Sequence, residues 1–125
     1  MNIKTGIEKA IDKLVESEKQ KVNILAFSIG GTIAWNFGLK TDNIKSLVCV
    51  SSTRLRNETE RPKGNLELYF GKNDEYKPTV EWFENMELEY EVLSDKGHQV
   101  YCETQFAEHL SSKIIKRHHN NVYKK

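Results

Sequence analysis

Two periods of hydrophobic positions alternate along this chain. In one kind of segment an apolar residue recurs every three or four positions, which is typical of a helix with one buried face. In the other kind, short runs such as Val22–Phe27 and Leu47–Val50 are apolar at almost every position, which is typical of strands buried on both faces. The pattern predicts helices over residues 5–19, 29–39, 80–86 and 104–117, and strands over residues 22–27, 47–50, 66–71 and 88–93.

The order of these segments predicts the fold class. Strand and helix mostly alternate, which favours a parallel sheet whose strands are joined by crossover helices. The charged, turn-rich segment Arg54–Gly64 is predicted to be a surface loop. A chain of 125 residues has the size of one ordinary domain. We therefore expect a single α/β domain over residues 1–125, with a small parallel sheet of about four strands and flanking helices.

The last two predicted strands differ from the first two. Glu67, Glu89 and Glu91 alternate with apolar residues there, so one face of this half of the sheet is expected to be wetter than the other. Before the short helix over 80–86, Pro78 suits a first helical position.

Composition and charge exclude several classes of protein. The chain is 38% hydrophobic and 30% charged, with a net charge of +1. Its lysines and arginines are scattered among matching acidic residues, so no nucleic-acid partner is expected. The sequence opens without an apolar leader and has no apolar run long enough to cross a membrane. We therefore expect a cytoplasmic protein without a membrane partner.

The cysteines and histidines give no sign of a metal site. Cys49 lies in an apolar run and is expected in the core, and Cys102 has no partner pattern, as in a reduced protein. His109, His118 and His119 have no cysteine or carboxylate that would complete a ligand set. Neither a metal nor a cofactor is expected.

Three residues with chemical potential directly follow predicted strands. Ser28 follows the first strand, Asp74 ends the segment Gly71-Lys72-Asn73-Asp74 after the third, and His98 follows Gly97 after the fourth. Each has a common structural role when taken alone: a serine caps a helix, an aspartate forms a turn, and a Gly-His pair belongs to a loop. In α/β sheets, however, sites gather at the carboxyl ends of the strands. Serine, aspartate and histidine in this order form the catalytic triad of the α/β hydrolases.

The local sequences resemble those of the α/β-hydrolase superfamily. Ala26-Phe27-Ser28-Ile29-Gly30 resembles the nucleophile elbow, with alanine at the first small position. Small residues at Ala26, Gly30 and Gly31 would let a serine sit on a sharp turn from strand to helix. Gly71–Asp74 resembles the acid turn of the family, and Gly97-His98 resembles its histidine loop.

The resemblance implies a role for each residue. Ser28 would be the nucleophile, His98 its general base, and Asp74 the group that orients the histidine, with Glu75 and Asp95 as alternative acids. The N–H of Ile29 would stabilise an oxyanion. The implied activity is that of a serine esterase or thioesterase that acts through an acyl-enzyme on a small ester or thioester. Phe27, Ser52 and Thr53 could line its pocket, although Ser52 and Thr53 would equally serve to end the second strand.

The resemblance also implies missing parts. Members of the family usually have several strands before the elbow, including the loop that donates a second oxyanion N–H, and many carry a cap domain. Here one helix precedes the elbow strand, so Val22–Phe27 becomes an edge strand, and such an edge invites pairing. We expect a second copy, another polypeptide or a rearranged N-terminal segment to cover it. A weak or inactive binding module, or one half of a split hydrolase, stays open as an alternative to the enzyme.

Overall fold

The computed structural model of the protein describes residues 3–103 and 105–113. Its helices and strands alternate along the chain as the sequence predicts. The elements are α1 (Ile3–Ser17), β1 (Val22–Phe27), α2 (Ile29–Lys40), β2 (Ile44–Val50), β3 (Asn65–Gly71), α3 (Val80–Asn85) and β4 (Glu89–Leu93), with two short 3₁₀ helices, η1 (Leu55–Asn57) and η2 (His98–Cys102). A further helix covers residues 105–113.

The four strands form one parallel sheet in the order β1-β2-β3-β4. In register, Ala26 lies beside Cys49, and Cys49 lies beside Leu68. Because every strand runs in the same direction, all four carboxyl ends meet at one end of the sheet. The predicted α/β class and four-stranded parallel sheet are confirmed, and β1 is an edge strand of that sheet, as expected.

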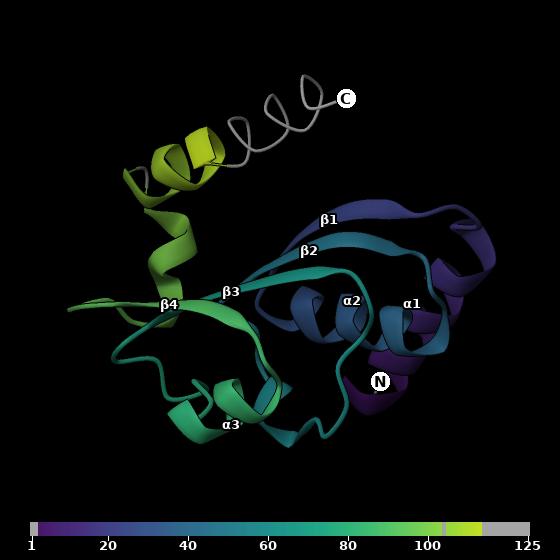
Figure 1. Ribbon diagram of the computed structural model, residues 1–125, viewed down its shortest axis with the longest axis horizontal. Coiled ribbons are helices and arrows are strands. Elements are labelled where there is room, and N and C mark those ends of the chain that lie inside the picture. Colours follow the sequence, from purple (N-terminus) through teal and green to yellow (C-terminus); the bar gives the residue numbers. More distant parts are fainter. Residues whose placement is uncertain (1–2, 104, 114–125) are drawn as a thin grey trace.

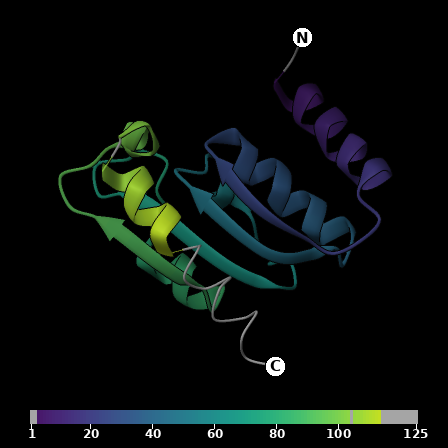
Figure 2. The ribbon, with the colours of Figure 1, turned by 90° about the horizontal axis from the view of Figure 1, so that it is seen from above.

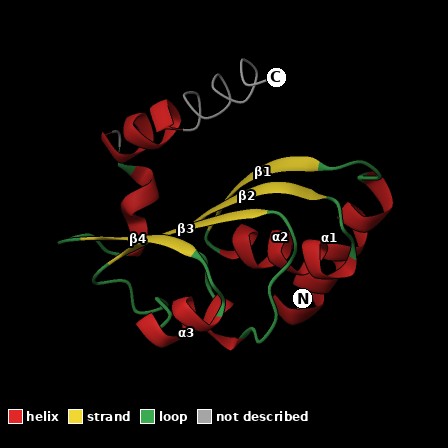
Figure 3. Ribbon diagram, in the orientation of Figure 1, coloured by secondary structure: helices red, strands yellow, loops and turns green. Residues whose placement is uncertain are grey.

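Most of the core lies on one face of the sheet. Figure 1 shows α1, α2 and α3 on this face, and Figure 3 separates the helical layer from the strands by colour. The helices and strands bury a continuous apolar cluster that includes Trp35, Phe37, Leu47, Leu68 and Phe83. Full burial of a side chain of this size contributes about 1.5–3 kcal/mol. Cys49 belongs to this core, and burial raises its pKa to about 12, so that it stays a neutral thiol.

The second face is covered in part by the helix over 105–113. Phe106 and Leu110 of this helix pack on Val48, Val50 and Tyr69 of the sheet, and Figure 1 shows the helix on the side opposite to α2. The prediction of a wetter face in this half of the sheet is wrong at Glu67, which is buried. Its carboxylate is compensated there by the hydroxyl of Tyr69 and the ammonium of Lys113.

Some predicted boundaries shift. The first helix starts two residues earlier than expected, at Ile3, and β2 starts three residues earlier, at Ile44. Pro78 is not the first residue of α3, because Thr79 caps that helix by accepting the Trp82 N–H through its hydroxyl (3.2 Å). The loop over 54–64 contains η1 and buries Leu55. Positions 104 and 114–117 of the last predicted helix lie outside the described residues.

Candidate active site

Ser28 occupies the sharp turn between β1 and α2. Its backbone has φ 52° and ψ −126°, and a non-glycine residue adopts such a positive φ only under strain. Three main-chain hydrogen bonds hold it: the Ser28 N–H donates to the Val50 carbonyl (2.9 Å), and the Ser28 carbonyl accepts from the N–H groups of Gly31 (3.1 Å) and Thr53 (3.3 Å). The Ser28 side chain makes no cap hydrogen bond to α2. Its hydroxyl is therefore left available for another partner.

Small residues around the turn let α2 pack tightly against the end of β2. A Cβ atom on Gly31 would overlap the Ser52 hydroxyl and lie 2.6 Å from the Ser52 Cβ, so only glycine fits there. Gly30 is less constrained, because a Cβ atom there would meet the Ala26 Cβ at an ordinary 3.9 Å. The tightest contact at the elbow is therefore at Gly31, not at Gly30.

Asp74 ends a tight turn after β3. The Asp74 N–H donates to the Gly71 carbonyl (3.0 Å), and the Tyr76 N–H donates to Asp74 Oδ1 (2.9 Å). The Asp74 side chain is fully enclosed, with 0% of its surface exposed. A buried carboxylate is costly unless it is paired and hydrogen-bonded. The Tyr76 N–H satisfies one oxygen, and the other faces His98.

The acid turn (residues 71–74) is joined to the histidine loop (residues 93–98) by the main chain. Two N–H groups of the turn donate to carbonyls of the loop at 2.8 Å, from Lys72 to Leu93 and from Asn73 to Lys96. Gly71 permits this approach, because a Cβ atom there would lie 2.6 Å from the Gly97 carbonyl oxygen. The obstacle is main chain, which cannot rotate away as a side chain can. The two loops therefore hold Asp74 and His98 as one unit.

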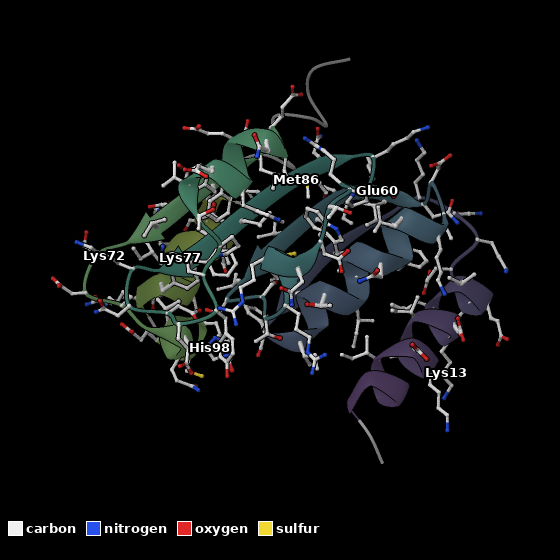
Figure 4. The ribbon with its side chains drawn as sticks, turned by 90° about the horizontal axis from the view of Figure 1, so that it is seen from below. Lys13, Glu60, Lys72, Lys77, Met86 and His98 are labelled. Carbon is white, nitrogen blue, oxygen red and sulfur yellow. The ribbon has the colours of Figure 1, made fainter. Side chains whose placement is uncertain are left out.

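Ser28, His98 and Asp74 form one line of hydrogen bonds. Ser28 Oγ lies 3.1 Å from His98 Nε2, and His98 Nδ1 lies 3.1 Å from Asp74 Oδ2. When the carboxylate accepts from Nδ1–H, Nε2 presents its lone pair to the serine hydroxyl. The His98 side chain is 21% exposed, so its ring can be reached from solvent. Figure 4 shows His98 on the side of the molecule far from Lys13 of α1.

Two aromatic rings flank the imidazole. The ring of Tyr76 meets it edge-on with centroids 5.2 Å apart, and that of Tyr101 does so at 6.0 Å. The Tyr101 ring also contacts the ring of Phe27 in β1, with centroids 5.5 Å apart. Arg56 lies over the Tyr76 ring, 5.9 Å from its centroid, and donates to the Glu75 carbonyl (2.9 Å).

Sequence reasoning missed Tyr76, Tyr101 and Arg56. The nearness of Tyr76 to Asp74 and of Tyr101 to His98 along the chain could have indicated the two tyrosines.

The other residues that the sequence singled out lie apart from this line. Glu75 and Asp95, the alternative acids, are exposed. Ser52 is fully buried behind the elbow, and Thr53 is half-buried, its carbonyl accepting a hydrogen bond from the Thr32 hydroxyl. Phe27 is 39% exposed next to the elbow.

The described part of the chain offers neither a metal site nor a membrane-spanning helix. No cluster of His, Cys, Asp and Glu there could hold a metal ion. Nor does that part contain a helix long and apolar enough to cross a membrane.

The main-chain N–H of Ile29 lies where the resemblance leads one to expect an oxyanion donor. Ile29 is the first residue of α2, so its N–H has no acceptor within the helix and is free to bind an anion. The described residues before β1 are α1 and the turn over 18–21. Neither is the loop from a preceding strand that the resemblance leads one to expect as the source of a second donor.

Comparison with known proteins gives the fold but no close relative. No model of a known protein family matches the sequence, and no curated protein is significantly similar to it. A protein from Thermoplasma acidophilum, described as a predicted CIB-like hydrolase, aligns over 93% of this chain with a TM-score of 0.67 and 18% identity. The chain spans 60% of the length of that protein.

Two further solved structures agree. A monoacylglycerol lipase from Paleococcus ferrophilus matches 88% of this chain with a TM-score of 0.68 and 14% identity, and 74% of its own chain is covered. Est1E from Butyrivibrio proteoclasticus, also solved with ferulic acid bound, matches 94% with a TM-score of 0.64 and 11% identity, and 70% of its own chain is covered. At such identities the likeness shows the fold: the chain has an α/β-hydrolase fold and is shorter than these hydrolases.

Proposed function

We propose that this protein is a serine hydrolase that cleaves small carboxylic esters or thioesters through an acyl-enzyme. The observation that carries the proposal is the line from Ser28 to His98 to Asp74, with both hydrogen-bonding distances at 3.1 Å. A serine hydroxyl is a weak nucleophile at neutral pH and needs an adjacent base. Here the base is in reach, and a buried carboxylate orients it.

In the first half-reaction, Ser28 Oγ attacks the carbonyl carbon of the substrate while His98 Nε2 accepts its proton. The carbonyl π electrons move onto oxygen, and the resulting oxyanion faces the Ile29 N–H. When the carbonyl re-forms, the bond to the alcohol or thiol breaks, and His98 returns the proton to the leaving group. Asp74 keeps the ring in the correct tautomer and stabilises its protonated form.

In the second half-reaction, water replaces the leaving group. His98 accepts a proton from water, the hydroxide attacks the acyl carbon, and the ester bond to Ser28 breaks as its oxygen regains the proton. The exposed side of the His98 ring offers a route for this water. Phe27 and Thr53 are proposed to border the acyl group. No metal or cofactor takes part in either step.

The single donor sets an expectation for the rate. Loss of one oxyanion donor costs about 2.7–4 kcal/mol, or about 10²–10³ in kcat. We therefore expect Ser28 to react readily with an activated probe. We expect the protein alone to hydrolyse unactivated esters slowly. A cytoplasmic location is proposed as well, because both cysteines are free thiols.

Covalent labelling with a fluorophosphonate tests the proposal. Ser28 Oγ would attack the phosphorus atom and expel fluoride, leaving a stable adduct. We expect labelling of the wild type and none of Ser28→Ala or His98→Ala, while Ser17→Ala, altered at an exposed serine of α1, labels like the wild type. A folded wild type that does not label, or labelling that persists in Ser28→Ala, would refute the hydrolase assignment.

The open edge of β1 favours a second candidate, in which the chain is one half of a split hydrolase or a binding module. The edge leaves room for a partner chain or a second copy, either of which could add the missing donor. Labelling of Ser28 without measurable turnover of p-nitrophenyl acetate would favour the half-enzyme. Absence of both activities would favour a binding module.

A further inference from the structure

An apolar groove runs along the outer edge of β1. It has a volume of about 570 Å³ and is lined by β1, by α2 and by Leu14 and Glu18 of α1. Among the described residues that line it, Glu18 alone is charged, and Leu25 is 46% exposed beside it. Apolar surface next to an uncovered strand edge typically marks an interaction site.

The groove also contains main-chain hydrogen-bonding groups. In a parallel strand the N–H and C=O groups of successive residues point alternately to the two sides. The N–H groups of Val22 and Ser28 donate toward β2, at 2.8 and 2.9 Å. By this alternation, the main-chain groups that point to the open side belong to Asn23, Leu25 and Phe27. Among the described residues no strand pairs with β1 on that side.

α1 has the position of a crossover helix. α2 joins β1 to β2 and contacts both strands, and α1 packs beside α2 in the same layer. Figure 2 shows α1 on the far side of α2 from β3 and β4. The helical layer thus extends one helix further than the sheet. A helix so placed normally covers a strand, so α1 leaves room for one more strand beside β1.

We propose that the groove binds an extended segment of a partner polypeptide, apolar on both faces, which pairs with β1 as a fifth strand. Only another main chain satisfies the donors and acceptors of Asn23, Leu25 and Phe27. An acyl chain would bury them without partners, which is strongly unfavourable. A neutral, apolar segment also suits a lining with one charge. The proposal is independent of whether Ser28 is a nucleophile.

Two other occupants fit less well. In a second copy paired antiparallel through its own β1, α2 would lie on the face that α1 of the first copy already occupies beside the groove, so two helices would need the same space. Residues 114–125 include the run Lys116-Arg117-His118-His119-Asn120-Asn121. A segment with so many polar side chains is a poor match for this lining.

Amide hydrogen exchange of the whole protein tests the proposal. The probe is a peptide rich in valine and isoleucine with lysines at both ends, and its control is the same peptide with an N-methylated main chain. At about 100 times its Kd, the probe should slow exchange about 100-fold at Asn23, Leu25 and Phe27. Exchange at Ile24 and Ala26, which face β2, should change little. The methylated peptide should protect none of them.

Two variants separate docking from folding. Leu25→Pro removes an N–H that points outward, so the protein should stay folded and lose the protection by the probe. Leu25→Lys keeps that N–H but adds a charge at an exposed position, and should weaken binding without unfolding the protein. Equal protection by both peptides, or protection by neither, would overturn the proposal. The proposal would also be overturned if the amides of Asn23, Leu25 and Phe27 were already protected from exchange in a dimer that forms with rising protein concentration. That result would assign the edge to a second copy.

Discussion

The carboxyl end of the sheet and the outer edge of β1 are built in opposite ways. At the carboxyl end, main-chain hydrogen bonds join the acid turn to the histidine loop, and the carboxylate of Asp74 is fully enclosed. Along the outer edge, Leu25 and Phe27 are exposed, and on that side no described strand pairs with β1. The two regions meet at Ser28, which directly follows β1.

This difference separates what the four strands supply from what they lack. Ser28, Asp74 and His98 follow β1, β3 and β4, so the observed sheet is sufficient to bring them together. At the elbow, the N–H of Ile29 is the one oxyanion donor that we propose. The proposed chemistry is therefore complete in its nucleophile and base, and its oxyanion site is the part that a docked strand could improve.

Among the substitutions that test this difference between the two regions, Asp74→Asn is expected to have the largest effect on the labelling rate. An asparagine whose carbonyl accepts the Tyr76 N–H would turn its amide N–H toward His98 Nδ1. The ring would then carry its proton on Nε2 and could not accept one from Ser28. We expect the rate of fluorophosphonate labelling to fall about 10⁴-fold with the fold retained. A rate within tenfold of the wild type would show that the carboxylate does not set the tautomer.

A smaller loss is expected when the contact between the two loops is disturbed. In Gly71→Ala the added methyl group meets the main chain at Lys96 and Gly97, so the histidine loop must move. A displacement of about 1 Å costs about 100-fold in rate, and overpacking destabilises by about 1–3 kcal/mol. The matched control is Gly97→Ala, because a Cβ atom there meets nothing within 4 Å. Equal labelling rates for the two variants would contradict the proposed coupling of the loops.

The elbow offers a similar pair of glycines. Gly31→Ala would force a methyl group onto Ser52 and should destabilise the protein by about 1–3 kcal/mol in urea unfolding. Gly30→Ala meets only an ordinary contact, and alanine is the better helix former by up to about 1 kcal/mol. It should match or exceed the stability of the wild type. If Gly31→Ala is as stable as Gly30→Ala, the elbow is looser than the structure indicates.

The sequence predicted the parts of this molecule that depend on local pattern. The strand Val22–Phe27 has the predicted bounds, because a short apolar run between polar ends leaves little choice of register. Ser28, Asp74 and His98 could be selected because a parallel sheet brings strand ends together wherever they lie in the chain. Their order along the chain then pointed to one family.

What the sequence missed depends on contacts between distant residues. Glu67 was expected to face water, but Lys113, on a helix far along the chain, lies 3.3 Å from its carboxylate and makes burial tolerable. Arg56 reaches Tyr76 from a segment predicted only as a loop. Nothing in the local pattern around either residue reveals its partner.

The smallest expected effect concerns the second face of the sheet, which helix 105–113 covers over β2 and β3 but not over Leu25 and Phe27. Lys113 donates to the Tyr69 hydroxyl at 3.0 Å. The pKa of Tyr69 is raised by burial and by the neighbouring Glu67, and the pKa of Lys113 is raised mainly by its hydrogen bond to Tyr69. Both groups therefore hold their protons more tightly in the folded state.

It follows that the stability supplied by this cluster is fully present below about pH 10, near the ordinary pKa values of both groups. It is lost as the pH rises through their raised values. Lys113→Met should cost about 1 kcal/mol or less at pH 8, and its difference from the wild type in urea unfolding should shrink as the pH rises above about 10. Lys113→Arg stays charged throughout this range and should lose less stability on the alkaline side. Parallel pH profiles for all three proteins would mean that the cluster does not hold the helix to the sheet.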